Sequence, residues 1–167
     1  MTLSVHAIAG TAVSLAFRNN PAIALLAAFF SHFLLDAFSH WHYRILSKSA
    51  DGLSPFGKKL DFGPGFLKDI FRTGIDFAIG LIVSLIVSAI FFPENLWLVF
   101  WAVIASALPD ALQVFYYRFK NFKPLYWFQW LHEAIHSEKR LDNEPAKGVA
   151  QQIVMAAILL FLIYYFH

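Results

Sequence analysis

Long runs of apolar side chains constrain the fold of this chain more than any other feature of its sequence. Five runs follow one another: Leu3–Phe17, Ala22–Phe38, Ile75–Phe92, Leu96–Tyr117 and Val149–Phe166. At ~1.5 Å per helical residue, all but the first would cross most of a ~30 Å hydrocarbon layer. We therefore expect an all-α polytopic membrane helix bundle with about five transmembrane helices. Residues 1–167 would form a single integral membrane domain.

The composition agrees with a membrane protein and limits the chemistry that the chain can perform. Hydrophobic residues make up 59% of the chain and charged residues 14%, whereas about a quarter of a soluble domain is charged. The net charge of +2 is mild, and we expect no nucleic-acid partner. The chain has no cysteine, so histidine and carboxylate side chains are the only strong metal ligands that it offers.

Basic residues predict the orientation in the membrane. Of the 13 Lys and Arg residues, all but Arg18 lie in two long connections, His40–Gly74 and Arg118–Lys147. Basic loops tend to stay in the cytoplasm. We therefore expect a protein of the inner (cytoplasmic) membrane, with its N-terminus and both long connections inside. The short turns Arg18–Pro21 and Pro93–Asn95 would lie outside, as would the C-terminus.

The two long connections differ in their predicted structure. Residues 51–66 read DGLSPFGKKLDFGPGF, in which glycine and proline argue against a continuous helix. The second connection contains Leu125–Ser137, a segment typical of an amphipathic helix lying in the membrane interface.

Ionisable residues of the apolar runs gather at one predicted level of the bilayer. His32, Asp36 and His40 follow one another at intervals of four, which places them on one face of a helix. The same leaflet is expected to hold His6, Asp76, Asp110, His132 and His136. A carboxylate in the bilayer core costs roughly 2.5–3.5 kcal/mol, and such residues are by default functional. A bound cation would offset this cost, because it supplies the missing charge.

The segment HEAIH at residues 132–136 adds a known metal pattern. In H-E-x-x-H, two histidines one turn apart bind zinc and the glutamate activates water. The chain offers more donors than one ion needs, and two-metal sites are typical of phosphatases and nucleases. We expect two or three Zn²⁺ ions, with Mn²⁺ or Fe as alternatives. The predicted metal ligands are His6, His32, Asp36, His40, Asp110, His132 and His136.

Short motifs across most of the chain resemble one known family. The motifs are HAIAG (6–10), SHFLLD (31–36), LSPFG (53–57), ALPD (107–110) and HEAIHS (132–137). They resemble the membrane-bound metal-dependent hydrolases of bacteria and archaea, whose sites are often linked to that of zinc-dependent phospholipase C. The resemblance implies a multi-pass inner-membrane protein with the ligands His6, His32, Asp36, Asp110, His132 and His136. In this chain S-H-x-x-x-D precedes L-P-D, and Glu133 replaces an arginine of the family pattern.

These observations lead to an expected activity. The chain would be a di- or tri-metal hydrolase that cleaves a phosphoester of a lipid or lipid-linked substrate at the cytoplasmic face, in lipid metabolism. Glu133 or Asp76 would act as the general base. The substrate phosphate would be bound by Arg72, Arg44, Lys58 and Lys59. His42 faces away from the stripe by helical spacing and is left out, and the terminal His167 is expected in solvent.

Other functions remain open. An HExxH-type intramembrane metalloprotease would use HEAIH and one aspartate. A membrane di-iron oxygenase also gathers histidines near the cytoplasmic side. An ion carrier would need polar residues through both leaflets, which the sequence lacks. A network of interhelical hydrogen bonds would give the same residues a purely structural role.

Overall fold

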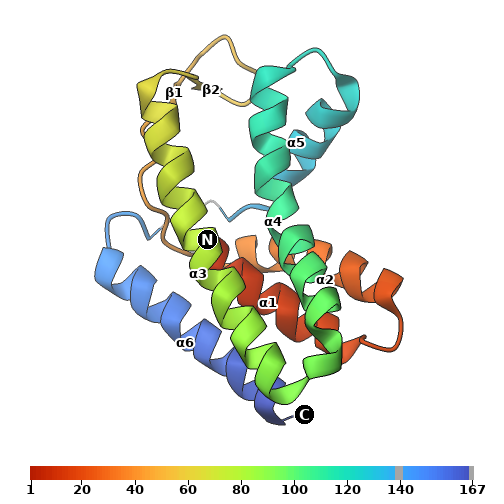
Figure 1. Cartoon of the computed structure of the whole chain (residues 1–167). Helices are drawn as coiled ribbons and strands as arrows, with labels where there is room; N and C mark the ends of the chain where they lie inside the picture. The colour runs from red at the N-terminus through yellow and green to blue at the C-terminus, as the bar shows by residue number, and fades with distance from the viewer. Residues whose placement is uncertain (138–140, 166–167) are drawn as a thin grey trace.

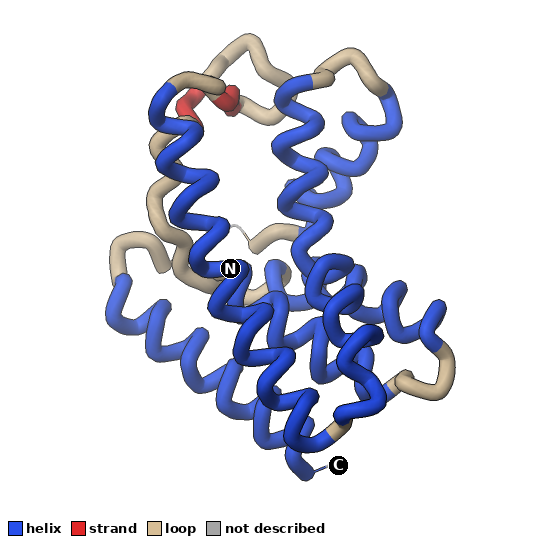
Figure 2. Tube along the Cα trace, viewed as in Figure 1, coloured by secondary structure: helices blue, strands red, loops and turns tan. Residues whose placement is uncertain are grey.

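The computed structural model describes residues 1–137 and 141–165, and this part of the chain is almost entirely helical (Figure 1, Figure 2). Its six α-helices are α1 (Leu3–Ala16), α2 (Pro21–Asp36), α3 (Pro64–Phe91), α4 (Leu96–Arg118), α5 (Lys123–Ile135) and α6 (Pro145–Tyr165). A short antiparallel hairpin of β1 (Lys48–Ala50) and β2 (Lys58–Leu60) precedes α3, and the 3-10 turn η1 (Pro93–Asn95) joins α3 to α4. The all-α prediction is confirmed.

The number of helices able to cross a membrane is smaller than the sequence predicts. Three helical segments are long and apolar enough: Pro64–Phe91, Pro93–Arg118 and Pro145–Tyr165. The helices α1 and α2 have 14 and 16 residues. At ~1.5 Å per residue they reach roughly 21 and 24 Å, short of the ~30 Å hydrocarbon layer. The expectation of about five spans is therefore corrected to three candidate spans and two shorter apolar helices.

The helix α1 is the centre of the bundle. It packs against α2, α3, α4 and α6, and nine of its 14 residues are buried. A Cβ atom added to Gly10 would lie 2.7 Å from Cβ of Ser106 in α4. One added to Gly80 of α3 would lie 2.6 Å from Cα of Ser4. Small residues at these contacts let the helix backbones approach closely, as is common between membrane helices.

The helix α3 begins eleven residues before its predicted start at Ile75. Gly63 has an extended backbone, and Pro64 occupies the first helical position, where its missing N–H leaves no bond unmade. The prediction of a non-helical segment is thus correct up to Gly63. Within that segment Gly57 adopts a φ of 66° at the hairpin turn, a conformation that glycine allows without strain.

The outer surface of the bundle is apolar. The large side chains exposed on α3 include Ile75, Ile79, Ile82, Ile86 and Ile90, at spacings of three and four residues. Those exposed on α2 are Ile23, Leu26, Phe30 and Leu34, and α6 exposes Ile153, Val154, Ile158 and Phe161. Such stripes cover the outward faces of helices that contact lipid. This surface and the three long helices indicate association with a membrane.

The predicted amphipathic helix is present as α5. It follows α4 after a short loop and lies at the same end of the bundle as the β-hairpin (Figure 1). Its buried residues are Gln129 and His132, whereas Trp127 and Trp130 are at least half exposed. The helix therefore turns its polar side chains inward, toward α4 and α2, which it contacts.

Candidate metal centre

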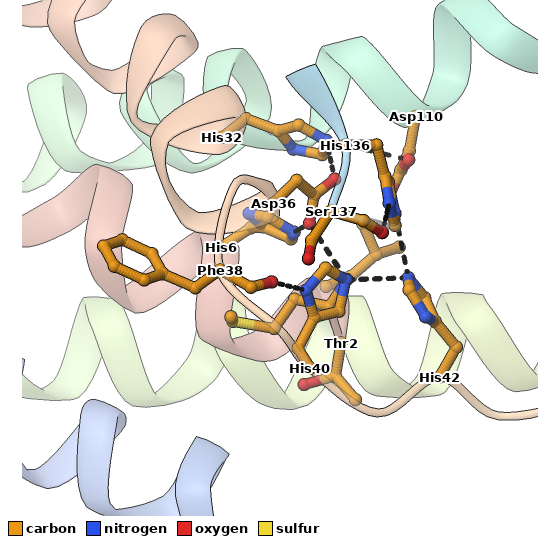
Figure 3. Close-up of polar contacts among 12 residues, drawn as sticks. Thr2, His6, His32, Asp36, Phe38, His40, His42, Asp110, His136 and Ser137 are labelled. Atoms are coloured by element: carbon orange, nitrogen blue, oxygen red, sulfur yellow. Dashed lines mark hydrogen bonds and ion pairs between the residues drawn. The ribbon is translucent and has the colours of Figure 1, made fainter. Parts of the chain in front are cut away.

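Six histidines and two aspartates converge where α1 begins and α2 ends (Figure 3). They come from α1, α2, α4 and α5 and from the non-helical segments that follow α2 and α5. We call them the histidine cluster: His6, His32, Asp36, His40, His42, Asp110, His132 and His136. The cluster contains every histidine of residues 1–137 and 141–165. His167 lies outside the described residues.

Asp36, the last residue of α2, lies at the centre of the cluster. Its Oδ1 is 3.3 Å from Nε2 of His6 and 3.4 Å from Nε2 of His40. Its Oδ2 is 3.3 Å from Nε2 of His32 and 3.6 Å from Nε2 of His132. The side chain is 4% exposed. One buried carboxylate thus faces four imidazoles, two on each oxygen.

The cluster contains two groups of possible metal ligands. The first, called the mixed site, consists of His32, Asp36, Asp110 and His132, and the second, called the trihistidine site, of His40, His42 and His136. Within each group the ligand atoms all lie within 4.8 Å of one another. Each group could therefore hold a metal ion.

The separations of the nitrogens suit metal coordination. Nε2 of His42 lies 2.9 Å from that of His40 and 3.3 Å from that of His136. In the mixed site, Nε2 of His32 and Nε2 of His132 are 3.3 Å apart. Two nitrogens bound at ~2.0–2.1 Å to one tetrahedral ion would be separated by roughly 3.3 Å.

Backbone carbonyls orient three of the imidazoles. Nδ1 of His32 lies 2.8 Å from the carbonyl oxygen of Ser106. Nδ1 of His40 lies 2.6 Å from that of Phe38, and Nδ1 of His136 lies 3.1 Å from that of Ser137. A carbonyl oxygen only accepts, so Nδ1 carries the hydrogen and donates it. When the ring is neutral, Nε2 then presents a lone pair to the cluster. Metal-binding histidines are typically oriented in this way.

Burial keeps several of these rings neutral. It lowers the pKa of His40 and of His132 to about 4, and it also lowers the pKa of His42. For His40 and His42 the positive amino terminus acts in the same direction. The neutral imidazole is the form that binds a metal ion, so these histidines are ready to coordinate at neutral pH.

His6 is buried without a hydrogen bond to either ring nitrogen in the described part of the chain. Its ring stacks on that of His32, with centroids 3.9 Å apart. An unsatisfied buried polar group costs about 1–3 kcal/mol, and a bound ion would remove that cost. His6 contacts the mixed site through Asp36 but belongs to neither group of possible ligands, so its role as a metal ligand stays a prediction.

Asp110 is the most open member of the mixed site, with 35% of its side chain exposed. Its Oδ1 lies 3.7 Å from Nε2 of His32 and 3.8 Å from Nε2 of His132. Gln113, one turn later in α4, donates a hydrogen bond of 2.9 Å from Nε2 to this oxygen. The sequence analysis missed Gln113, although its spacing of three from Asp110 places both on one helix face.

His42 was expected to face away from the cluster, but the structure places it in the trihistidine site. The argument extended helical spacing to residue 42, but α2 ends at Asp36 and residues 41–45 are not helical. His40 reaches the cluster in the same way, from the segment beyond the helix. Residues two apart lie on the same side of an extended segment, so the pair His40 and His42 carried the signal.

Asp76, predicted as a general base, is placed elsewhere. Its Oδ2 accepts a hydrogen bond of 2.6 Å from the backbone N–H of Leu3. The first N–H groups of a helix have no partner within it, so this carboxylate satisfies the start of α1. Asp76 belongs to neither ligand group, and the structure gives it an anchoring contact instead.

Glu133, the other predicted base, is paired with a lysine. Nζ of Lys58 in β2 lies 3.0 and 2.7 Å from its two oxygens, and Gln129 donates to one of them at 3.1 Å. Burial raises the pKa of Glu133, but the ion pair with Lys58 outweighs burial and holds that pKa below its usual range. A carboxylate with a lowered pKa is a weak general base.

The four residues predicted to bind phosphate do not join the cluster. Lys58 is occupied by Glu133, and the exposed Lys59 lies opposite Ser49 in the hairpin. The Arg72 guanidinium binds a carboxylate oxygen of Asp69 at 3.3 Å and the carbonyl oxygen of the exposed Arg44. The prediction placed these residues near the cluster by sequence distance, whereas their contacts are with α5, β1, the loop before the hairpin and the start of α3.

Comparison of the chain with family models, curated proteins and solved structures finds no match. The resemblance to the membrane-bound metal-dependent hydrolases therefore stays a prediction from short motifs. The geometry by itself describes a buried cluster of oriented histidines and carboxylates with two groups that could hold metal ions.

Proposed function

We propose that this protein is a membrane-embedded hydrolase that uses two metal ions to cleave a phosphoester of a lipid or lipid-linked substrate. The observation that carries the proposal is the convergence of six imidazoles in one cluster, four of them facing Asp36, with Nδ1 of three of the six held by backbone carbonyls. Basic residues are concentrated in the two long connections that flank the cluster, which favours a site facing the cytoplasm of the inner membrane.

The donor set fits zinc or a similar ion. The mixed site offers two imidazoles and two carboxylates, and the trihistidine site offers three imidazoles. Zinc, manganese and iron all accept such ligands, with zinc preferred where imidazoles dominate. Asp36 would link the two sites, since its Oδ1 is 3.4 Å from Nε2 of His40 while its Oδ2 faces His32 and His132.

The residues of the chain would divide the work between them. Two neighbouring ions, when bound by these residues, would supply an activated water and polarise the phosphoryl oxygens. Asp36, buried among imidazoles, balances the positive charge of the centre and excludes water from its inner side. Asp110 lies on the open side, where a substrate would enter, and Gln113 holds its carboxylate in place. The apolar outer faces of α2 and α3 favour a substrate with an acyl chain.

The arrangement favours this function over an HExxH metalloprotease. The helix α5 ends at Ile135, and His136 has extended dihedral angles of −62° and 128°. Its imidazole belongs to the trihistidine site, while His132 belongs to the mixed site. The two histidines of the motif are thus divided between groups, and Glu133 is engaged by Lys58. A single-ion protease would need the two histidines on one ion and the glutamate beside it.

Elemental mass spectrometry on the detergent-purified chain tests the proposal. We expect about two ions per chain, together with release of phosphate from lipid phosphates such as phosphatidic acid. His32→Ala should reduce both the metal content and the activity. Glu94→Gln, in η1 at the other end of the bundle, is the matched control and should change neither.

Two outcomes would overturn the proposal. Absence of bound metal in protein purified without chelator would leave the cluster as a structural hydrogen-bond network. Two irons per chain, with no phosphate released from any lipid phosphate, would point to a di-iron oxygenase instead.

A further inference from the structure

An apolar cavity lies at the opposite end of α1 from the histidine cluster. Its volume is about 500 Å³, and its walls come from the ends of α1, α3 and α6. Twelve residues separate His6 from Arg18 at its rim, or roughly 18 Å along a helix. The lining side chains include Ala12, Ala16, Phe17, Phe92, Leu159 and Leu162, and Arg18 is the one charged residue among those that line it.

Arg18 has most of its hydrogen-bonding capacity free. Its Nη1 donates to the carbonyl oxygen of Leu15 at 3.2 Å, and its guanidinium lies 5.2 Å from the ring centroid of Phe92. No acidic side chain in residues 1–137 and 141–165 forms an ion pair with it. Glu94, on the neighbouring turn η1, accepts instead from Asn95 at 2.6 Å. A guanidinium has five N–H donors in a fork that suits phosphate, so Arg18 can bind an anion.

The position of this charge is unusual within the chain. Arg18 is the only Lys or Arg outside the two long connections. The cavity beside it opens between helices whose exposed side chains are apolar, such as Ile90 of α3 and Phe161 of α6. An apolar void left empty forfeits dispersion contacts along its walls. The combination of an apolar cavity and a lone cation at its rim matches an amphiphile with an anionic head.

We propose that this cavity binds one acyl chain of an anionic phospholipid whose phosphate pairs with Arg18. The net negative charge of the head complements the unpaired guanidinium, whereas the choline of a zwitterionic lipid would cancel that advantage. The site shares no residue with the histidine cluster. It therefore stands or falls independently of the proposed hydrolase function.

Native mass spectrometry of the full chain in detergent tests the proposal. The chain is titrated with phosphatidylglycerol or with phosphatidylcholine of the same acyl chains. We expect one phosphatidylglycerol to be retained at about tenfold lower concentration than phosphatidylcholine. Arg18→Gln should abolish this preference, and Arg18→Lys should keep part of it, since lysine retains the charge but loses the fork.

Two further variants separate the cavity from general electrostatics. Ala16→Phe fills the cavity and should block retention of the lipid while Arg18 is still present. Arg118→Gln, a basic residue at the end of α4 near the other end of the bundle, should leave the preference unchanged.

Equal retention of phosphatidylglycerol by the wild type and by Arg18→Gln would overturn the proposal. So would equal affinity of the wild type for both lipids. Because Arg18 is exposed, its replacement leaves the fold intact, and an unchanged metal content of each variant checks this.

Discussion

Polar groups are buried together at one end of α1, whereas a single charged residue lies exposed at the other end. At the end that carries His6, the eight side chains of the histidine cluster, Asp36 among them, are turned inward, and carbonyl groups orient three of their rings. At the other end, Arg18 stands alone on the rim of an apolar cavity. The first arrangement turns carboxylate oxygens and imidazole nitrogens toward one another and toward the amino group of Met1, which lies 3.0 Å from Oδ1 of Asp36, so it suits a cation. The second lacks a counter-charge and calls for an anion with an apolar tail.

The strongest test of this contrast is Asp36→Asn. The change keeps the size of the side chain but removes the charge that faces four imidazoles. Metal content should fall from about two ions per chain to a trace, because the mixed site loses a ligand and the trihistidine site loses the carboxylate that faces His40. Retention of phosphatidylglycerol at the Arg18 end should not change. Full metal content in this variant, measured by elemental mass spectrometry, would show that Asp36 is not at the centre of the site.

The second test separates the two groups within the cluster. His132→Ala removes a ligand of the mixed site, and His136→Ala removes one of the trihistidine site. Each variant should lose about one ion and keep the other, because the group that the substitution does not touch retains all its ligands. Isothermal titration with Zn²⁺ on metal-free protein measures this. If either variant alone loses all metal, the two groups form a single centre.

A smaller effect is expected at Gln113. Its amide holds the Asp110 carboxylate, so Gln113→Ala should weaken metal binding at the mixed site by about 10- to 100-fold and leave the trihistidine site unchanged. Asn95→Ala, which removes an amide that donates to Glu94 in η1 at the other end of the bundle, is the control and should have little effect on affinity. An unchanged Zn²⁺ affinity in Gln113→Ala would exclude a positioning role for this residue.

The smallest effect concerns Lys58 and Glu133. Both side chains are 26% exposed, so their ion pair should contribute about 0.2–1 kcal/mol to the free energy of unfolding. A double-mutant cycle of Lys58→Met and Glu133→Gln, followed by thermal unfolding in detergent, measures the coupling. Metal content should stay unchanged in all three variants. A loss of hydrolysis by about 100-fold in Glu133→Gln, with Lys58→Met active, would restore Glu133 as the general base.

The apolar runs predict most of the fold because lipid-facing helices must be apolar along their length. The bounds of α1 and α4 agree with the predicted runs to within one residue. The start of α3 was missed because its first residues, Pro64–Gly74, lie before the apolar run and include polar side chains, yet are helical. The number of spans was overestimated because an apolar run shows composition and not where the helix ends. The helix α2 ends at Asp36, before the end of its apolar run, and this places Asp36 in the cluster.

The residue types of the candidate site could be predicted from the sequence, but which side chains contact one another could not. The histidines and aspartates of the apolar runs stand out in so apolar a sequence, so their gathering at one end of the bundle could be predicted. Which of the predicted site residues bind other partners instead depends on packing between distant segments. Asp76 meets the start of α1, and Glu133 meets Lys58 of the hairpin, 75 residues away. His42 was missed because its geometry follows from where α2 ends.

The distance along the chain between the ligands has a consequence for the order of assembly. His32 and His132 lie 100 residues apart, and their nitrogens meet only when α2, α4 and α5 have docked together. Contacts of such long separation form late, since the loop between them must first close. An ion held by this cluster would therefore be captured after the helices are inserted and packed. Metal binding would then be the last step of assembly. In a cell short of the metal, the inserted and packed protein would accumulate without its ion.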